Sequence, residues 1–251
     1  VHYLLEHILR HRSWQVEDGQ GGSTWDPKEV RARIRAIMDR YIAEELGGLE
    51  NKTPRFVYLF DRLLWPVAQV VENVLEELSV SSFQPIAFEL GFGTGKDLPP
   101  VELTVDGVTV SVSGFVDRLD GWVHDGRLYL RVMDYKTGRK SFDLTEIWNG
   151  LGLQMLLYLF TLEEKGESLY NYAVTPAGVL YLPARAAVVQ GSRSMDEQER
   201  KKRMDAELRR HGLLLDDPEV LEAMERPEAG GPRFLPVRVS AKSGAITGEA
   251  L

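Results

Sequence analysis

The chain has 251 residues, of which 43% are hydrophobic and 27% are charged, so it is large enough to bury an ordinary hydrophobic core. Its 30 basic and 38 acidic side chains give a net charge of −8, which excludes a protein that binds nucleic acid by bulk positive charge but not a nuclease, whose centre needs acidic groups. The chain has no cysteine, which excludes a disulfide, a thiolate zinc site and an iron–sulfur cluster built from its own side chains.

The first 80 residues have the hydrophobic periodicity of helices, which we predict over residues 1–12, 27–46 and 55–79. Asp26 is a good N-cap and Pro27 a favourable first helical residue, so the second helix should start there, whereas Pro66 should weaken the third. We expect residues 1–80 to form a helical flank. Because the amphipathic pattern is already under way at Val1, we interpret the chain as an excised fragment of a larger subunit.

After residue 80, strand-like runs alternate with helical ones. The predicted strands cover residues 85–91, 101–105, 108–120, 127–136, 168–175, 178–183, 233–239 and 244–247. The predicted helices cover residues 145–165, ended by Gly166, then 195–211 and 217–226. This order predicts an α/β fold in which the 145–165 helix packs against a central mixed sheet built on the 108–136 hairpin. No hydrophobic run approaches the ~18 residues that span a membrane, so we expect no membrane segment.

The dipeptide Asp125-Gly126 is a strong signal for a tight hairpin turn. Centring the turn there makes paired residue numbers sum to 251, which places Trp122 opposite Tyr129 and Asp120 opposite Arg131. An aromatic pair and an opposite-charge pair both support this register. It also places Asp117 opposite Asp134.

Opposed carboxylates repel one another unless a cation lies between them. Two carboxylates and several waters suit Mg²⁺, and Lys136, on the same face as Asp134 and opposite Phe115, would point at an anion held there. A metal, a water and a lysine facing a phosphate form a site for phosphodiester hydrolysis. The alternative is that Asp117 and Asp134 are solvated ends of strands, and one β-bulge would change the register.

The pattern Gly114-x-x-Asp117 followed by Asp134-Tyr-Lys136-Thr-Gly138 resembles the PD-(D/E)XK nuclease superfamily, whose fold is restriction-endonuclease-like. More narrowly, the chain resembles the AddB family, the nuclease domains of B subunits of bacterial ATP-dependent helicase–nucleases. The segments that carry this narrower resemblance are 1–6, 82–89, 150–158, 212–217 and 234–237.

The resemblance implies a role for each matching residue. His2, Asp117, Asp134 and the carbonyl of Tyr135 would bind the metal, and Lys136 would be the catalytic lysine. Gln154 and Tyr158 match a glutamine–tyrosine motif beside the active site, and we expect Gln154 to be buried because its neighbours are hydrophobic. Glu89, between Phe88 and Leu90 on a predicted strand, is either a further metal ligand or half of a structural ion pair.

The resemblance also implies a function. The chain would be the residue 81–251 nuclease core, with a C-terminal extension and the 1–80 flank that brings in His2, of a Mg²⁺-dependent DNA exonuclease that processes double-strand breaks for recombinational repair. Mn²⁺ could substitute for Mg²⁺, and the expected partners are a single-stranded DNA end and an AddA-type subunit in the bacterial cytoplasm. The family's four cluster-binding cysteines are absent here. The alternatives are a non-catalytic DNA-guiding or subunit-docking module and a free-standing exonuclease or restriction-type enzyme.

Two further patterns carry less weight. Residues 91–97 resemble a phosphate-binding P-loop but are one spacer short and lack Ser or Thr after Lys96. The basic run 200–203 shares its predicted helix with several acids, so we interpret it as a solvated face.

Overall fold

The computed structural model describes residues 1–11, 16–17, 23–138, 142–189, 195–226, 231–240, 242–243 and 246–248. The chain divides into two compact units: residues 1–80 with 183–208, and residues 81–182 with 209–251. Residues 183–208 belong to the first unit because the helix within this segment lies against a helix of residues 1–80, where Lys201 pairs with Glu76. The division into a 1–80 flank and an 81–251 nuclease core with a C-terminal extension stays a prediction.

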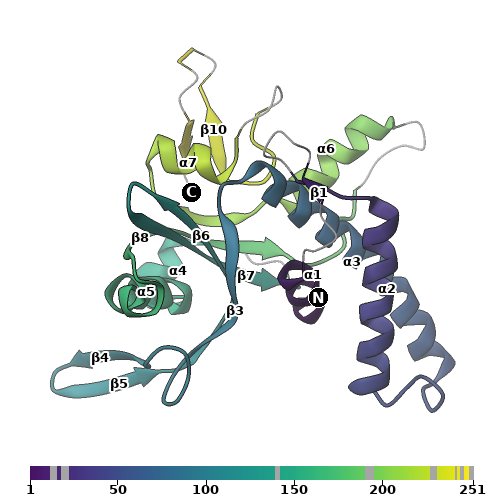
Figure 1. Cartoon of the computed structure of the whole chain (residues 1–251), viewed down its shortest axis with the longest axis horizontal. Helices are drawn as coiled ribbons and strands as arrows, with labels where there is room; N and C mark the ends of the chain where they lie inside the picture. Colours follow the sequence, from purple (N-terminus) through teal and green to yellow (C-terminus); the bar gives the residue numbers. More distant parts are fainter. Residues whose placement is uncertain are drawn as a thin grey trace. The chain divides into compact units, whose positions relative to one another are not determined.

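The described part of the first unit is mainly helical (Figure 1). Its helices are α1 (His2–Arg10), α2 (Pro27–Glu44), α3 (Pro54–Val80) and α6 (Glu197–Leu208), beside a short pair of strands, β1 (Val16–Glu17) and β2 (Ser23–Thr24). Asp26 caps α2 as predicted, because its carboxylate accepts a 2.8 Å hydrogen bond from the amide of Lys28. Helix α3 continues through Pro66. Fully buried apolar side chains include Leu5, Val30, Val71, Val74 and Leu75.

The second unit is built on a sheet with the strand order β3-β6-β7-β8-β9. These strands are β3 (Gln84–Phe92), β6 (Gly114–His124), β7 (Arg127–Lys136), β8 (Ala173–Pro183) and β9 (His211–Leu214). The pairs β3–β6, β6–β7 and β8–β9 are antiparallel. Arg127, at the start of β7, hydrogen-bonds Thr175 near the start of β8, and Lys136, at the end of β7, lies over Tyr181 near the end of β8. These two strands therefore run in the same direction, and the predicted mixed sheet is confirmed.

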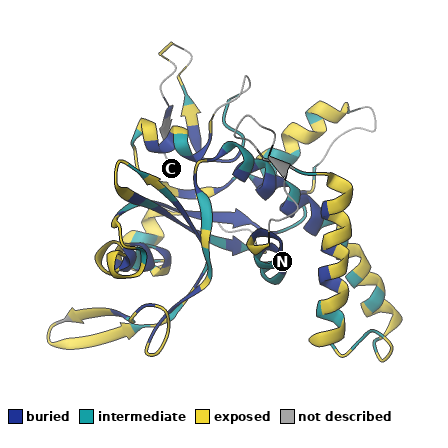
Figure 2. Cartoon of the chain, in the orientation of Figure 1, coloured by how far each residue is buried: buried dark blue, intermediate teal, exposed yellow. Residues whose placement is uncertain are grey.

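The hairpin register is the predicted one from the turn to Arg118–Met133, including Trp122–Tyr129 and Asp120–Arg131. Asp125 and Gly126 both have positive φ, as the tight turn requires. The predicted strand over 108–120 is instead two strands. Strand β5 (Val108–Val112) pairs with β4 (Val101–Val105) in a separate hairpin, whose mostly exposed residues extend away from the sheet in Figures 1 and 2.

The predicted helix over 145–165 starts near the observed position, but it is interrupted and it extends beyond residue 165. It is split into α4 (Leu144–Trp148) and α5 (Gln154–Tyr170), because Gly150 and Gly152 adopt positive φ between them. Helix α5 continues through Gly166, where a Cβ atom would lie 2.9 Å from Cγ2 of Val174, so this glycine allows close packing rather than ending the helix. The left-handed Asn171 ends α5 instead.

The longer α5 shortens the strand region after it, so the strands predicted at 168–175 and 178–183 are one strand, β8. Helix α5 packs its buried face on the sheet as expected, and the core there includes Leu119, Leu130, Val132, Tyr158 and Leu162. The remaining elements are α7 (Pro218–Met224), β10 (Val237–Val239) and β11 (Ile246–Gly248). Residues 244 and 245 of the last predicted strand lie outside the described residues.

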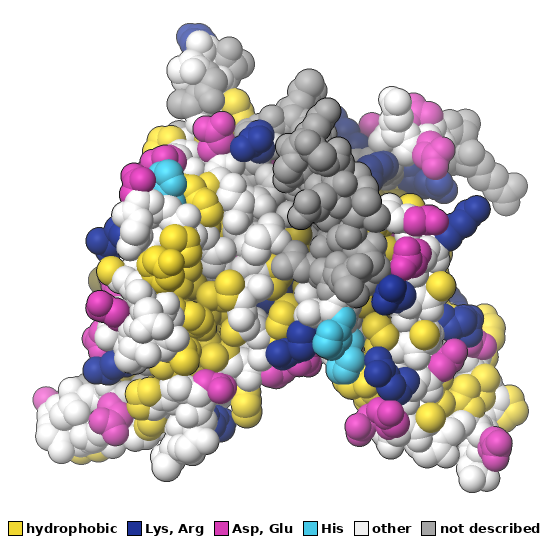
Figure 3. Space-filling model, viewed as in Figure 1, with side chains coloured by type: hydrophobic (Ala, Val, Ile, Leu, Met, Phe, Trp, Pro, Cys, Tyr) yellow, Lys and Arg dark blue, Asp and Glu magenta, His cyan; other side chains and the backbone are white. Residues whose placement is uncertain are grey.

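Within the described residues, no helix is both long enough and hydrophobic enough to cross a membrane. Hydrophobic side chains do reach the surface over the α2–α3 pair, at the lower right of Figure 3. The exposed ones on the first half of α3 include Tyr58, Leu59, Leu63 and Trp65.

Candidate active site

Asp117, Asp134 and Lys136 lie at the end of the β6–β7 hairpin that is remote from its turn. The amide of Tyr135 donates a 2.6 Å hydrogen bond to Oδ2 of Asp117, which holds this carboxylate beside β7. Nζ of Lys136 forms an ion pair with Oδ2 of Asp134, and these two side chains are 32% and 21% exposed. Strand pairing thus brings two carboxylates and a lysine to one partly shielded place.

The β6–β7 ladder ends at Arg118–Met133, one pair before Asp117 and Asp134. The side chain of Asp117, rather than its backbone, takes the next amide of β7, so the two acids are neighbours without being a ladder pair. The predicted pairing of Phe115 with Lys136 does not form. Phe115 pairs with Gly91 of β3, and Nζ of Lys96 lies 3.8 Å from the centre of its ring.

Asp134 and Lys136 also face Tyr181 on β8. Nζ of Lys136 lies 5.3 Å from the centre of the Tyr181 ring. Burial raises the pKa of Tyr181, and the negative charges of Asp134 and Glu146 raise it further. Sequence reasoning missed Tyr181 and Glu146, because the closeness of Tyr181 to Asp134 and to Glu146 depends on how β8 and α4 pack.

Gln154 and Tyr158 share one face of α5 as their spacing predicted. Nε2 of Gln154 donates a 2.8 Å hydrogen bond to Oη of Tyr158. Tyr158 is buried and its ring stacks on Phe92 at a centroid distance of 4.4 Å. The prediction that Gln154 is buried is wrong: it is exposed, because it is the first residue of α5 and follows the glycine-containing turn.

Gly114 positions this motif against β6. A Cβ atom at residue 114 would overlap Oη of Tyr158 and lie 3.0 Å from Nε2 of Gln154. The glycine of the Gly-x-x-Asp pattern is therefore needed for the close approach of α5 to the strand that carries Asp117. The motif itself was the signal for this role.

We expect Gly114→Ala to destabilise the chain by about 1–3 kcal/mol, because Tyr158 must leave its buried position. Urea unfolding measures the change. The double variant Gly114→Ala with Tyr158→Phe should recover part of the loss, since it removes the overlapping oxygen. Equal stability of Gly114→Ala and the wild type would contradict the packing described.

Glu89 is exposed and has a φ of 50°, which is unusual for a strand residue. Its neighbours Phe88 and Leu90 pair with Arg118 and Val116, so the register places Glu89 across from Asp117. Acids thus occur on three adjoining strands. The role of Glu89 as a metal ligand stays a prediction.

His2 is the first residue of α1, in the first unit, and its role as a ligand also stays a prediction. Among the residues that the structure describes, no group of three or more His, Asp or Glu side chains has the spacing of a metal site. The donors that the hairpin brings together are the carboxylates of Asp117 and Asp134, and the carbonyl of Tyr135 directly follows Asp134 in sequence. Such oxygen donors suit Mg²⁺, which binds few protein ligands and keeps several waters.

The loop at 91–97 is not arranged to hold a phosphate. Oδ2 of Asp97 accepts a 2.8 Å hydrogen bond from the amide of Gly91, so a carboxylate takes a donor that a phosphate would need. The side chain of Lys96 lies over Phe115 instead.

Two tyrosines in the second unit should make stability fall at high pH. Burial raises the pKa of Tyr135, Arg118 lowers it by less, and the charges of Asp120 and Asp117 raise it further. Burial and the charge of Asp97 raise the pKa of Tyr170 to about 12. The unfolded chain loses these protons near pH 10. Above that pH the folded state binds more protons than the unfolded state, so stability declines between about pH 10 and 12. Urea midpoints measured across this range should decline less in a Tyr135→Phe, Tyr170→Phe variant, and an equal decline would contradict the assignment.

The model of the PD-(D/E)XK nuclease superfamily matches residues 1–231, and the chain belongs to this superfamily. The α/β fold with its mixed sheet is accordingly restriction-endonuclease-like, as the resemblance implied.

Among its relatives are proteins named as the B subunits of ATP-dependent helicase/deoxyribonucleases. That of Clostridium novyi (strain NT) is 32% identical over 231 residues, which cover 90% of this chain and 20% of the relative. That of Moorella thermoacetica is 33% identical over 234 residues, covering 92% and 20%, and that of Acetivibrio thermocellus is 34% identical over 215 residues, covering 85% and 19%. The chain spans about a fifth of the length of these relatives.

Proposed function

We propose that this chain hydrolyses phosphodiester bonds of DNA as the exonuclease domain of a bacterial helicase–nuclease that processes double-strand breaks. The observation that carries the proposal is the grouping of Asp117, Asp134 and Lys136 on one hairpin. Membership of a nuclease superfamily and the names of the relatives support it. The proposed partners are the single-stranded DNA end and a second, AddA-type subunit, in the cytoplasm.

We propose Mg²⁺ as the cofactor, held by Asp117, Asp134 and the carbonyl of Tyr135, with His2 and Glu89 as further candidate ligands. A bound divalent cation would polarise the phosphoryl oxygen and favour ionisation of a water. The hydrogen bond from Tyr135 fixes one oxygen of Asp117 and thereby orients its carboxylate.

Lys136 would stabilise the charge that develops on the phosphate during hydrolysis. In hydrolysis a bond forms between the water oxygen and phosphorus, the ester P–O bond breaks, and the leaving oxygen gains a proton. Charge grows on the phosphoryl oxygens as the water adds. The ammonium of Lys136, which pairs with Asp134, would offset that charge and orient the water. The exposed Gln154 would line the approach of the strand, and its hydrogen bond to the buried Tyr158 would orient its amide.

End-labelled single-stranded DNA tests this proposal. We expect the intact helicase–nuclease to degrade the strand in Mg²⁺ or Mn²⁺, and we expect EDTA to stop cleavage and added Mg²⁺ to restore it. Comparing 5′ and 3′ labels reads the polarity. If Lys136→Met in this chain leaves degradation of both strands unchanged, the chain is instead a non-catalytic DNA-guiding or docking module.

A further inference from the structure

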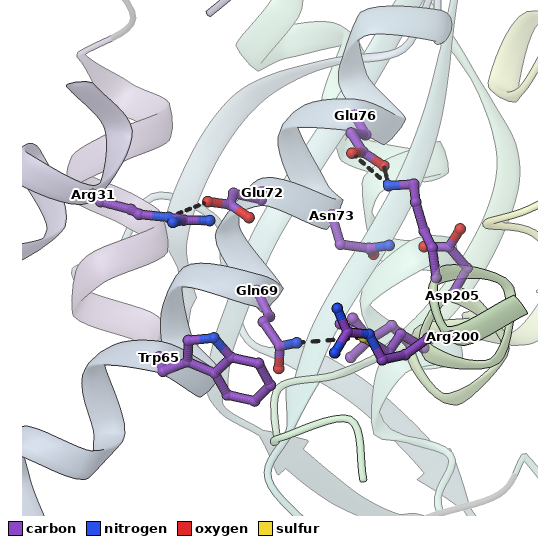
Figure 4. A pocket seen from close by; sticks show the side chains of 11 residues that line it. Arg31, Trp65, Gln69, Glu72, Asn73, Glu76, Arg200 and Asp205 are labelled. Atoms are coloured by element: carbon purple, nitrogen blue, oxygen red, sulfur yellow. Dashed lines mark hydrogen bonds and ion pairs between the residues drawn. The ribbon is translucent and has the colours of Figure 1, made fainter. Parts of the chain in front are cut away.

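A pocket with a volume of about 360 Å³ lies within the first unit, between α2, α3 and α6. Figure 4 shows Trp65, Gln69 and Asn73 on successive turns of α3, between Arg31 of α2 and Arg200 of α6. All these residues belong to one compact unit, remote in sequence from the carboxylate hairpin. The pocket's size is at the lower end of the range for small-ligand sites.

The buried amide of Gln69 is the most telling feature of this pocket. Gln69 is 8% exposed, and its Oε1 atom is buried with no hydrogen-bond donor among the described residues. Its Nε2 atom has only the sulfur of Met204, at 3.7 Å. Buried amides in folded proteins are normally satisfied by stronger partners. A ligand with a donor and an acceptor on one edge would supply them.

The charges around the pocket balance. Three basic residues (Arg31, Arg200 and Lys201) and three acidic residues (Glu72, Glu76 and Asp205) line it. Arg31 pairs with Glu72 and Lys201 with Glu76, each at 2.9 Å. A phosphate would meet as many negative as positive groups, so the pocket favours a neutral ligand.

Trp65 adds an aromatic surface to the pocket. Its side chain is 62% exposed although it is among the largest of apolar groups. Exposed aromatic rings in proteins that bind single strands serve as stacking platforms for bases. Primary amides such as Gln69 and Asn73 hydrogen-bond the edges of unpaired bases.

From the buried amide, the balanced charge and the exposed indole, we propose that this pocket holds one unpaired base of single-stranded DNA, stacked on Trp65 and hydrogen-bonded by Gln69. The choice of a DNA strand as the source of the base rests on the proposed function. The pocket would then bind the strand that the carboxylate hairpin cleaves.

The test measures binding without cleavage. Labelled oligonucleotides of about 12 nucleotides, in EDTA, are titrated with the chain and followed by fluorescence anisotropy. We expect Trp65→Ala to weaken binding roughly tenfold, the effect of one stacked base, and Gln69→Leu several-fold. Trp65→Phe should restore most of the affinity. Tyr58→Ala is the matched control, since Tyr58 is a similarly exposed aromatic residue of α3 outside the pocket.

An abasic strand with the same number of phosphates separates base binding from charge. We expect the abasic strand to bind the wild type about as weakly as the normal strand binds Trp65→Ala. The abasic strand should bind Trp65→Ala no more weakly than that, because both changes remove the same contact. Equal affinity for normal and abasic strands, or wild-type affinity in both Trp65→Ala and Gln69→Leu, would overturn the proposal. The proposal would also be overturned if free deoxyadenosine displaced the labelled oligonucleotide as effectively as an unlabelled strand does. The pocket would then be a site for a free nucleoside.

These outcomes are distinguishable from failure of the nuclease assignment. Asp134→Ala should keep the base-dependent binding while losing cleavage. If the wild type cleaves DNA but shows no base-dependent binding, only the pocket proposal fails. Thermal melting of each variant by circular dichroism shows whether its fold is intact.

Discussion

Asp134→Ala is expected to lower the rate of metal-dependent DNA cleavage roughly 1000-fold or more, because a bound metal contributes several kcal/mol to such a reaction and each ~1.4 kcal/mol is a factor of ten. Asp134 is the carboxylate that pairs with Lys136, so the change also releases the lysine from its partner. One substitution would therefore affect both the bound metal and Lys136, the two groups proposed to act on the phosphate.

The measurement is single-turnover cleavage of end-labelled DNA by the intact helicase–nuclease. Asp216→Ala is a matched control, because Asp216 is an exposed acid of the same unit, so this variant should cleave at the wild-type rate. If the Asp134→Ala variant cleaves DNA at the wild-type rate, on the strand that this chain is proposed to cut, the active site lies elsewhere.

Asp120→Ala is expected to destabilise the chain by about 3–5 kcal/mol, because it leaves two buried arginines without their shared anion. Nε of Arg118 lies 2.8 Å from one oxygen of Asp120 and Nε of Arg131 lies 3.0 Å from the other. All three side chains are 0% exposed. Domains are typically stable by only about 5–15 kcal/mol, so such a loss removes much of the total.

Urea unfolding followed by tryptophan fluorescence measures this loss, and Trp122 in β6 reports on the same strand. The control is Glu72→Ala, which breaks the exposed Arg31–Glu72 pair and should cost less than about 1 kcal/mol. A similar midpoint for Asp120→Ala and Glu72→Ala would contradict the assignment of a structural role to the buried cluster.

The cluster also explains how the hairpin is held. Side chains alternate along a strand, so Arg118, Asp120 and Arg131 lie on the face opposite Asp117 and Asp134. The buried ion pairs join the two strands on this face. They thereby also fix the distance between the backbones that carry Asp117 and Asp134 on the other face. The position of the carboxylates thus depends on buried residues of the opposite face.

Local sequence signals predicted the hairpin well. The Asp125-Gly126 turn sets the register, and paired residues two apart, Trp122–Tyr129 and Asp120–Arg131, confirm it. These contacts join residues that are close in sequence, and they depend on the positive-φ turn geometry that Gly and Asp favour. Hence Asp117, Asp134 and Lys136 could be brought together without a structure.

Long-range packing could not be predicted in the same way. Gly166 was expected to end a helix, yet it lies within α5 because β8 packs closely against it. Gln154 was expected to be buried, yet the left-handed glycines before it place it at an exposed helix start. Tyr181 and the pocket beside Trp65 arise from elements far apart in the chain, so no spacing signals them.

Asp117 and Asp134 together should hold a divalent cation, and titration of Mn²⁺ into the metal-free chain, followed by electron paramagnetic resonance, tests this expectation most directly. We predict bound Mn²⁺ in the wild type and in Asp216→Ala, and at least a roughly tenfold weaker affinity in both Asp117→Asn and Asp134→Asn. Mn²⁺ bound equally tightly by all four proteins would contradict the metal site and, with it, the proposed chemistry.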